Sequence, residues 1–339
     1  MTQTDTPTHT VVVPASIPMV ALLGPNDENL ALIEKAFEAD VHVRGDQISM
    51  HGDPAVVALV ERLLDELVAM IRTGQGVTPE TVEHAIGILR TETSVRPADV
   101  LSLNILSNRG RTIRPKTLNQ KRYVDAIDKH TVVFAIGPAG TGKTYLAMAK
   151  AVQALQHKSV NRIILSRPAV EAGERLGFLP GTLSEKIDPY LRPLYDALHD
   201  MVDPDSIPKL LAAGTIEVAP LAFLRGRSLN DAFIILDEAQ NTSPEQMKMF
   251  LTRLGFGSKM VVTGDVTQVD LPAGTHSGLR IVEGILGGID GVSFNRLTAH
   301  DVVRHRLVGH IVAAYDEYDA RRTVEEAGRR SDGPHRTRA

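Results

Sequence analysis

The octapeptide Gly-Pro-Ala-Gly-Thr-Gly-Lys-Thr at residues 137–144 restricts the fold of this chain more than any other feature of its sequence. It directly follows an apolar run at 131–136, which predicts a buried strand, and it leads into a helical pattern at 143–156. Glycines let backbone N–H groups approach phosphate oxygens closely, and the N-terminus of a helix favours negative charge. A strand, such a loop and a helix in this order predict a phosphate-binding loop within an α/β domain.

We expect this loop to bind the phosphates of a nucleoside triphosphate. Lys143 is expected to reach the β- and γ-phosphates, and the hydroxyl of Thr144 is expected to ligate Mg²⁺. The residues expected to contact the nucleotide are Gly137, Pro138, Ala139, Gly140, Thr141, Gly142, Lys143 and Thr144. A glycine-rich turn that binds nothing is the alternative, and the flanking strand and helix argue against it.

Two carboxylates, Asp237 and Glu238, follow the apolar run Phe233–Leu236. In a parallel sheet, ligands gather at the carboxyl ends of the strands, so this pair should lie beside the loop. Asp237 is expected to hold Mg²⁺, and Glu238 is expected to orient and deprotonate the attacking water. A solvated acidic pair at the end of a strand is the alternative.

A second polar strand end occurs where the run Met260–Thr263 is followed by Gly264 and Asp265. Gln268 comes three residues later and could contact the γ-phosphate or the attacking water, so it joins Lys143 and Glu238 as a predicted catalytic residue. The alternative is a turn that Asp265 stabilises. Further short apolar runs alternate with helical stretches, which predicts a mostly parallel sheet with helices on both faces.

The N-terminal region has a different pattern, with the order β-α-β-β-α if Pro18–Leu23 is a strand. This order resembles a reduced KH domain, but Gly24–Asp27 has one glycine and an acidic residue where a KH loop clamps the nucleic-acid backbone. An oligomerisation or docking module is the alternative. The chain is thus expected to contain a disordered tail (1–14), a small KH-like α+β domain (15–92), a linker (93–116), the P-loop domain (117–320) and a basic disordered tail (321–339).

Composition excludes several other classes of protein. The chain contains no cysteine, which rules out disulfides and thiolate metal sites and suits a reducing cytoplasm. No apolar run approaches the roughly 18 residues of a membrane helix, and the N-terminus lacks a signal-peptide pattern. The net charge is −4, so RNA would need a local basic surface. The candidates for that surface are Arg225, Arg227, Arg175, Lys186 and Phe178, with salt bridges or solvated faces as the alternative.

Several segments together resemble a known family. Residues 237–240 and 264–268 resemble motifs II and III of superfamily 1 helicases, and 118–120 lies where those enzymes carry an adenine-reading glutamine. Residues 167–181 and 301–305 closely resemble the PhoH-like ATPase family, which is named for phosphate-starvation induction. The resemblance covers about residues 110–315, and the N-terminal region fits the longer members.

The resemblance implies a RecA-like core that hydrolyses ATP, a link to RNA remodelling or helicase activity, and adenine reading by Gln120. It also implies an rRNA-processing endoribonuclease as a partner. A nucleotide-switched oligomeric binding module without translocation is the alternative. A small-molecule kinase fits less well because Glu238 resembles a water activator, and a GTPase fits less well because no Asn-Lys-x-Asp segment is present.

Superfamily 1 helicases place ATP between two RecA-like domains, and the second domain supplies arginines. Only residues 298–339 follow Leu297, too few for such a domain. Either hydrolysis is slow, or a neighbouring subunit supplies an arginine in trans, which predicts a homo-oligomer such as a hexameric ring. Arg304 is the leading candidate, Arg280 and Arg167 are alternatives, and pairing of Arg304 with Asp301 would remove it from this role.

Overall fold

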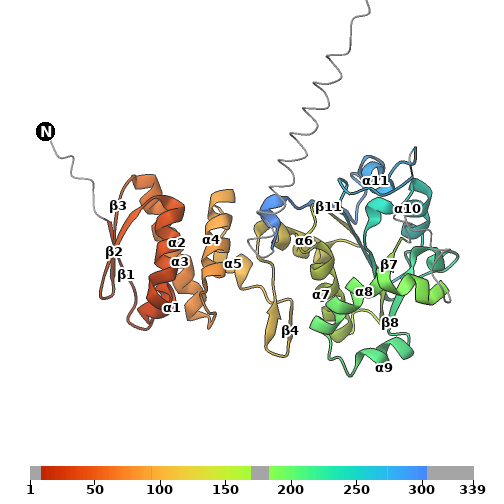
Figure 1. Ribbon diagram of the computed structural model, residues 1–339, viewed down its shortest axis with the longest axis horizontal. Helices are drawn as coiled ribbons and strands as arrows, with labels where there is room; N and C mark the ends of the chain where they lie inside the picture. Colours follow the sequence, from red (N-terminus) through yellow and green to blue (C-terminus); the bar gives the residue numbers. More distant parts are fainter. Residues whose placement is uncertain (1–8, 93, 169–182, 273, 304–339) are drawn as a thin grey trace, which may run out of the picture.

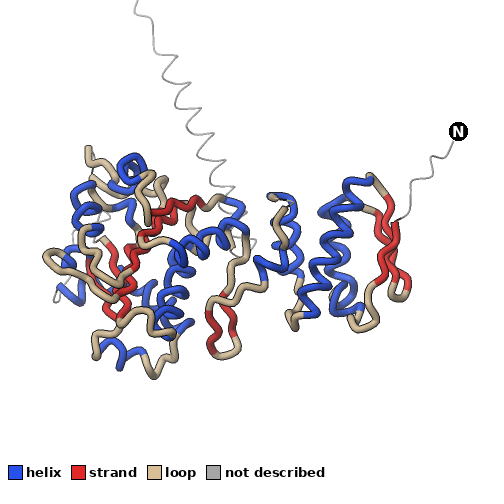
Figure 2. Tube along the Cα trace, turned by 180° about the vertical axis from the view of Figure 1, so that it is seen from behind, coloured by secondary structure: helices blue, strands red, loops and turns tan. Residues whose placement is uncertain are grey.

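The computed structural model describes residues 9–92, 94–168, 183–272 and 274–303. Helices and strands of the N-terminal region lie beside a larger α/β core (Figures 1 and 2). The predicted fold class is confirmed, because the core contains a parallel six-stranded sheet and the N-terminal region contains a small antiparallel sheet. None of the described helices is both long and apolar enough to cross a bilayer.

The N-terminal sheet has the order β1-β3-β2, and its strands are antiparallel. Asp53 caps the long helix α3, because its carboxylate accepts a hydrogen bond from the Ala55 N–H at 2.7 Å. The elements are β1 (His9–Val12), α1 (Met19–Leu23), the 3₁₀ turn η1 (Pro25–Asp27), α2 (Glu28–Phe37), β2 (Asp40–Arg44), β3 (Gln47–His51), α3 (Pro54–Arg72) and α4 (Pro79–Thr91).

Two predictions for this region are wrong. Residues 9–12 are not part of a loose tail, because they form an edge strand in which His9 pairs with Met50. Pro18–Leu23 is not a strand, because Met19–Leu23 forms the helix α1 and buries Leu22 and Leu23. The observed order is therefore β-α-α-β-β-α, which includes the two consecutive helices of a KH-like unit. The expected loop Gly24–Asp27 lies between these two helices.

The described part of the predicted linker, residues 94–116, has secondary structure of its own. It contains α5 (Pro97–Leu101) and a short hairpin of β4 (Leu106–Asn108) and β5 (Arg111–Ile113). Leu101 packs in the hydrophobic core of the N-terminal region, whereas Leu106 and Ile113 pack in the core of the larger domain. The two ends of this segment are therefore held by different cores.

The large sheet has the order β11-β6-β10-β9-β7-β8, and all its paired strands are parallel. Residues of α6, α7 and α8 cover one face, and residues of α10 and α11 cover the other. The elements are α6 (Leu118–Lys129), β6 (Val132–Ile136), α7 (Lys143–Gln156), β7 (Arg162–Arg167), α8 (Leu183–Met201), α9 (Ile207–Ala212), β8 (Ile216–Pro220), η3 (Leu221–Leu224), β9 (Ala232–Leu236), η4 (Ala239–Asn241), α10 (Pro244–Leu251), β10 (Lys259–Gly264), α11 (Gly278–Leu286), β11 (Val292–Arg296) and η5 (Ala299–Asp301).

The order of the central strands decides where the site forms. β6 and β9 are buried at every position, as a sheet covered on both faces requires. β10 lies between them and pairs with both, so the loop after β6 and the acidic pair after β9 are separated by one strand. The carboxyl end of β10 therefore reaches the same edge between the two predicted parts of the site.

Candidate nucleotide-binding site

The glycine-rich loop joins β6 to α7 and curls through left-handed backbone at Gly140 (φ 82°) and Gly142 (φ 78°). Lys143 is nearly buried, and its Nζ donates to the carbonyl oxygens of Gly137 and Pro138 at 2.7 Å each. Its ammonium group therefore lies along the loop. Tyr123 donates from its hydroxyl to the Lys143 carbonyl at 3.1 Å, and burial, with a smaller effect of Asp237, raises the pKa of this phenol well above its usual value. The phenol stays protonated and supports the start of α7.

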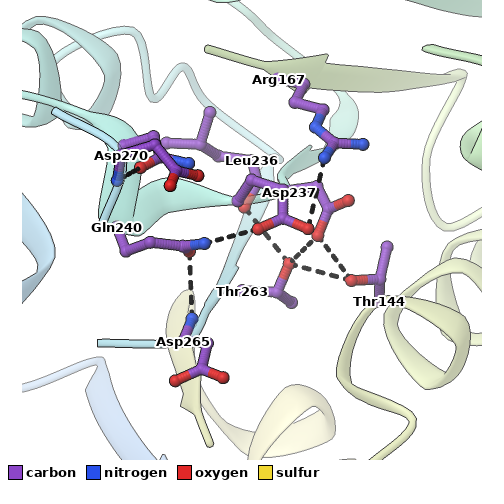
Figure 3. A network of polar contacts seen from close by, with 10 residues as sticks. Thr144, Arg167, Leu236, Asp237, Gln240, Thr263, Asp265 and Asp270 are labelled. Atoms are coloured by element: carbon purple, nitrogen blue, oxygen red, sulfur yellow. Dashed lines mark hydrogen bonds and ion pairs between the residues drawn. The ribbon is translucent and has the colours of Figure 1, made fainter. Parts of the chain in front are cut away.

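A hydroxyl and a carboxylate from distant parts of the chain meet beside this loop. Thr144 Oγ1 lies 2.6 Å from Asp237 Oδ1, and Thr263 Oγ1 donates to the same carboxylate oxygen at 2.8 Å (Figure 3). Two oxygen donors of this kind, completed by phosphates and water, fit the ligand preference of Mg²⁺. Asp265 Oδ2 is also buried and has no hydrogen-bond partner among the described residues, so an acceptor remains there for water.

Glu238 follows directly and has backbone in the left-handed region, with φ 52° and ψ 38°. Its Oε2 accepts a hydrogen bond from Gln240 Nε2 at 2.5 Å, and its Oε1 lies 3.3 Å from Arg167 Nη2. Gln240 Oε1 in turn accepts from the Asp265 N–H at 3.0 Å (Figure 3). The predicted base is thus connected to both neighbouring strand ends.

The glycine-rich loop, the acidic pair and the end of β10 line one cavity of about 270 Å³. Gln268 lies at its wall, where the sequence predicted a contact with phosphate or water. The lining residues are Ala139, Gly140, Gly142, Lys143, Thr144, Tyr145, Asp237, Glu238, Gly264, Asp265 and Gln268. The structure therefore brings together the predicted Lys143, Thr144, Asp237, Glu238 and Gln268, whose chemical roles stay predictions.

The candidate arginines differ in their positions. Arg280 donates to the Val266 carbonyl from Nε at 3.0 Å and from Nη2 at 2.6 Å, and Arg167 pairs with Glu238 of its own chain. Arg304 lies outside the described residues.

Among the predicted RNA contacts, Arg227 forms a two-bond ion pair with Glu217, at 2.5 and 2.7 Å. Arg175, Phe178 and the side chain of Lys186 also lie outside the described residues.

Gln120 is buried beneath the loop. Its Oε1 accepts from the Lys116 N–H at 2.7 Å, and its Nε2 donates to the carbonyl oxygens of Thr141 (3.0 Å) and Asp301 (3.4 Å). The amide is therefore already engaged with protein groups. Adenine reading by Gln120 stays a prediction, and this geometry favours a role in supporting the loop.

The Gln120→Ala variant tests the two roles. If Gln120 supports the loop, ATP and GTP should lose the same fraction of their affinity, because both nucleotides need the loop. Titration of both nucleotides measures the two dissociation constants. Gln153→Ala removes a comparable amide outside the pocket and should change neither constant. A selective loss of ATP affinity in Gln120→Ala would support adenine reading instead.

Sequence reasoning missed several residues of the site. Asp301 is buried and accepts hydrogen bonds from Thr117, Asn119 and Thr298, while the Val303 N–H donates to the Gly140 carbonyl at 3.0 Å. The segment after β11 thus holds the loop from outside. Thr263 and Gln240 lie within segments that the sequence analysis had already singled out, and Tyr145 directly follows the octapeptide. Their closeness in sequence to these segments is the signal that could have identified them as site residues.

A loop of this shape between β6 and α7, facing an acidic residue across one intervening strand, defines a P-loop NTPase with a RecA-like core. Comparison with known proteins then places the chain in a family. The family model described as "PhoH-like protein" matches residues 112–316, so this protein belongs to the PhoH-like family.

Relatives extend this similarity over most of the chain. The "PhoH-like protein" of Mycobacterium tuberculosis (strain ATCC 25618 / H37Rv) is 66% identical over 316 residues, 93% of this chain and 90% of the relative. The "PhoH-like protein" of Bacillus subtilis (strain 168) is 52% identical over 299 residues, 88% of this chain and 94% of the relative. The "Protein PhoH" of Escherichia coli (strain K12) is 45% identical over 198 residues, 58% of this chain and 56% of the relative.

Proposed function

We propose that this protein binds ATP with Mg²⁺ and hydrolyses it, and that hydrolysis is coupled to remodelling of RNA. The observation that carries the proposal is the meeting of Thr144 and Asp237 at 2.6 Å beside the loop, with Glu238 in the same cavity. An ATPase needs both a phosphate-binding loop and a hydrolytic carboxylate, and the position of Glu238 at the same sheet edge as the glycine-rich loop supports the proposal.

Each group has a distinct part in the proposed reaction. Lys143 and the loop N–H groups bind the phosphates, and Thr144 and Asp237 hold the metal. Mg²⁺, when bound, neutralises charge on the β- and γ-phosphates. Glu238 accepts a proton from water as the water oxygen bonds to the γ-phosphorus, the bond from this phosphorus to the bridging oxygen breaks, and ADP leaves with that electron pair. Gln268 orients the water or the γ-phosphate.

The proposal includes a homo-oligomer in which a neighbouring subunit supplies an arginine to the site. It also includes a cytoplasmic location, RNA and an rRNA-processing endoribonuclease as partners. These parts rest on the family resemblance and on the lack of cysteine rather than on contacts in the described residues.

A nucleotide-switched binding module is the second candidate function. The observation that favours it is that protein donors contact both carboxylate oxygens of Glu238, which would slow proton transfer from water. In this case ATP would change the assembly state, and turnover would be incidental.

One experiment separates the two candidates: the ATPase rate with and without RNA, alongside mass measurement with and without nucleotide. For a remodelling ATPase, we expect RNA to raise the rate and nucleotide to favour an oligomer. A rate that RNA leaves unchanged, with nucleotide-dependent assembly, would favour the switched module. A strict monomer with full activity would exclude an arginine supplied in trans, and a folded chain that binds no ATP would overturn the whole proposal.

A further inference from the structure

Arg167 and Glu238 are brought together by neighbouring strands of the sheet. Arg167 is the last residue of β7, and Glu238 comes two residues after β9. Ser166 pairs with Leu236 in the register of these strands, and the Asp237 N–H donates to the Ser166 carbonyl at 2.9 Å. The arginine is therefore placed at the acidic pair by the sheet itself (Figure 3).

The ion pair between these two residues has the geometry of an exchangeable contact. Arg167 Nη2 lies 3.3 Å from Glu238 Oε1, and the two side chains are 23% and 35% exposed. The pair of Arg227 and Glu217 in the same chain is closer, with bonds of 2.5 and 2.7 Å. An ion pair of this length between partly solvated side chains contributes little to stability, so Arg167 and Glu238 can separate readily.

We propose that Arg167 exchanges partners: it pairs with Glu238, and it transfers to the terminal phosphate when a nucleoside triphosphate occupies the loop. The inference rests on the proposed function above. A γ-phosphate carries more negative charge than a carboxylate and can accept two parallel bonds from a guanidinium group. The transfer stabilises the triphosphate and removes the cation from Glu238, which then accepts a proton from water.

Gln240 keeps Glu238 in place during this exchange. Its Nε2 donates to the second carboxylate oxygen at 2.5 Å, and its own carbonyl oxygen accepts from the Asp265 N–H at 3.0 Å. Gln240 is therefore held at both ends of its amide. One neighbour of Glu238 is fixed and the other is exchangeable, so the carboxylate stays in the cavity when the arginine leaves.

The test measures the equilibrium affinity for a non-hydrolysable ATP analogue and for ADP, both with Mg²⁺. We expect Arg167→Gln to lower the affinity for the analogue by about tenfold. The affinity for ADP should stay nearly unchanged, because ADP lacks the terminal phosphate. Glu238→Gln should raise the affinity for the analogue but not for ADP, because it removes the carboxylate that competes with the terminal phosphate for Arg167. This gain should disappear in the double variant.

Two control variants are available. Arg167→Lys keeps the charge and should retain part of the preference for the analogue, whereas Arg227→Gln removes an arginine from an ion pair outside the cavity and should change neither affinity. Thermal melts establish that each variant is folded. Two outcomes would overturn the partner exchange but not the proposed function. One is an equal loss of affinity for both nucleotides in Arg167→Gln. The other is a gain of affinity in Glu238→Gln that persists when Arg167 is also replaced. A folded wild-type chain that binds neither nucleotide would overturn the proposed function as well.

Discussion

Replacing Glu238 with glutamine is expected to lower kcat for ATP hydrolysis by about 10²–10⁴-fold while nucleotide binding is retained. The glutamine amide cannot accept the proton of the attacking water, but it leaves Lys143, Thr144 and Asp237 in place. Steady-state phosphate release measures the rate, and titration with a labelled nucleotide measures binding.

Glu245→Gln is a matched control, because Glu245 is an exposed acid in the first turn of α10 and does not line the cavity. It should keep the wild-type rate. If Glu238→Gln turns over ATP as fast as the wild-type chain, another group is the base, and the assignment of Glu238 is wrong.

Gly137→Ala is expected to destabilise the fold by about 1–3 kcal/mol and to abolish nucleotide binding. A Cβ atom at this position would lie 2.4 Å from the Leu297 carbonyl oxygen. That carbonyl cannot withdraw easily, because the Leu297 N–H donates to the Ile136 carbonyl at 2.8 Å. The added methyl group must therefore displace either the loop or the segment after β11. Chemical denaturation and nucleotide titration measure the two effects.

The same substitution at Gly284 should have the opposite sign. Gly284 lies within α11, and a Cβ atom there would meet nothing within 4 Å. Alanine is favoured over glycine in helices, so Gly284→Ala should stabilise the protein by about 0.5–1 kcal/mol and leave binding unchanged. If the Gly137→Ala protein is as stable as the wild type in chemical denaturation and binds ATP, the added methyl group does not crowd the loop, and the prediction is wrong.

The sequence was most informative where local pattern and chemistry coincide. The apolar run before residue 137 and the helical pattern after it predicted a strand, a loop and a helix, and these elements are present. Short apolar runs were less informative, because Met19–Leu23 has the composition of either a helix or a strand and only its packing decides. The edge strand His9–Val12 escaped notice because it is largely exposed and carries little hydrophobic pattern.

The candidate site shows a similar division. The sequence marked Thr144 and Asp237 through separate patterns, but their distance depends on the strand order, which no local pattern encodes. The position of β10 between β6 and β9 also brings Thr263 to the same carboxylate. Asp301 supports the loop from a segment more than a hundred residues away in the chain, so its contact with Thr117 could not be read from spacing.

The left-handed backbone at Glu238 has a consequence for how this protein can change. A residue with a side chain costs about 1–2 kcal/mol in this conformation, whereas glycine adopts it freely. A search for more heat-resistant variants would therefore favour glycine at position 238 and recover a protein without its proposed base. Stability and the proposed turnover therefore place opposite demands on this one residue.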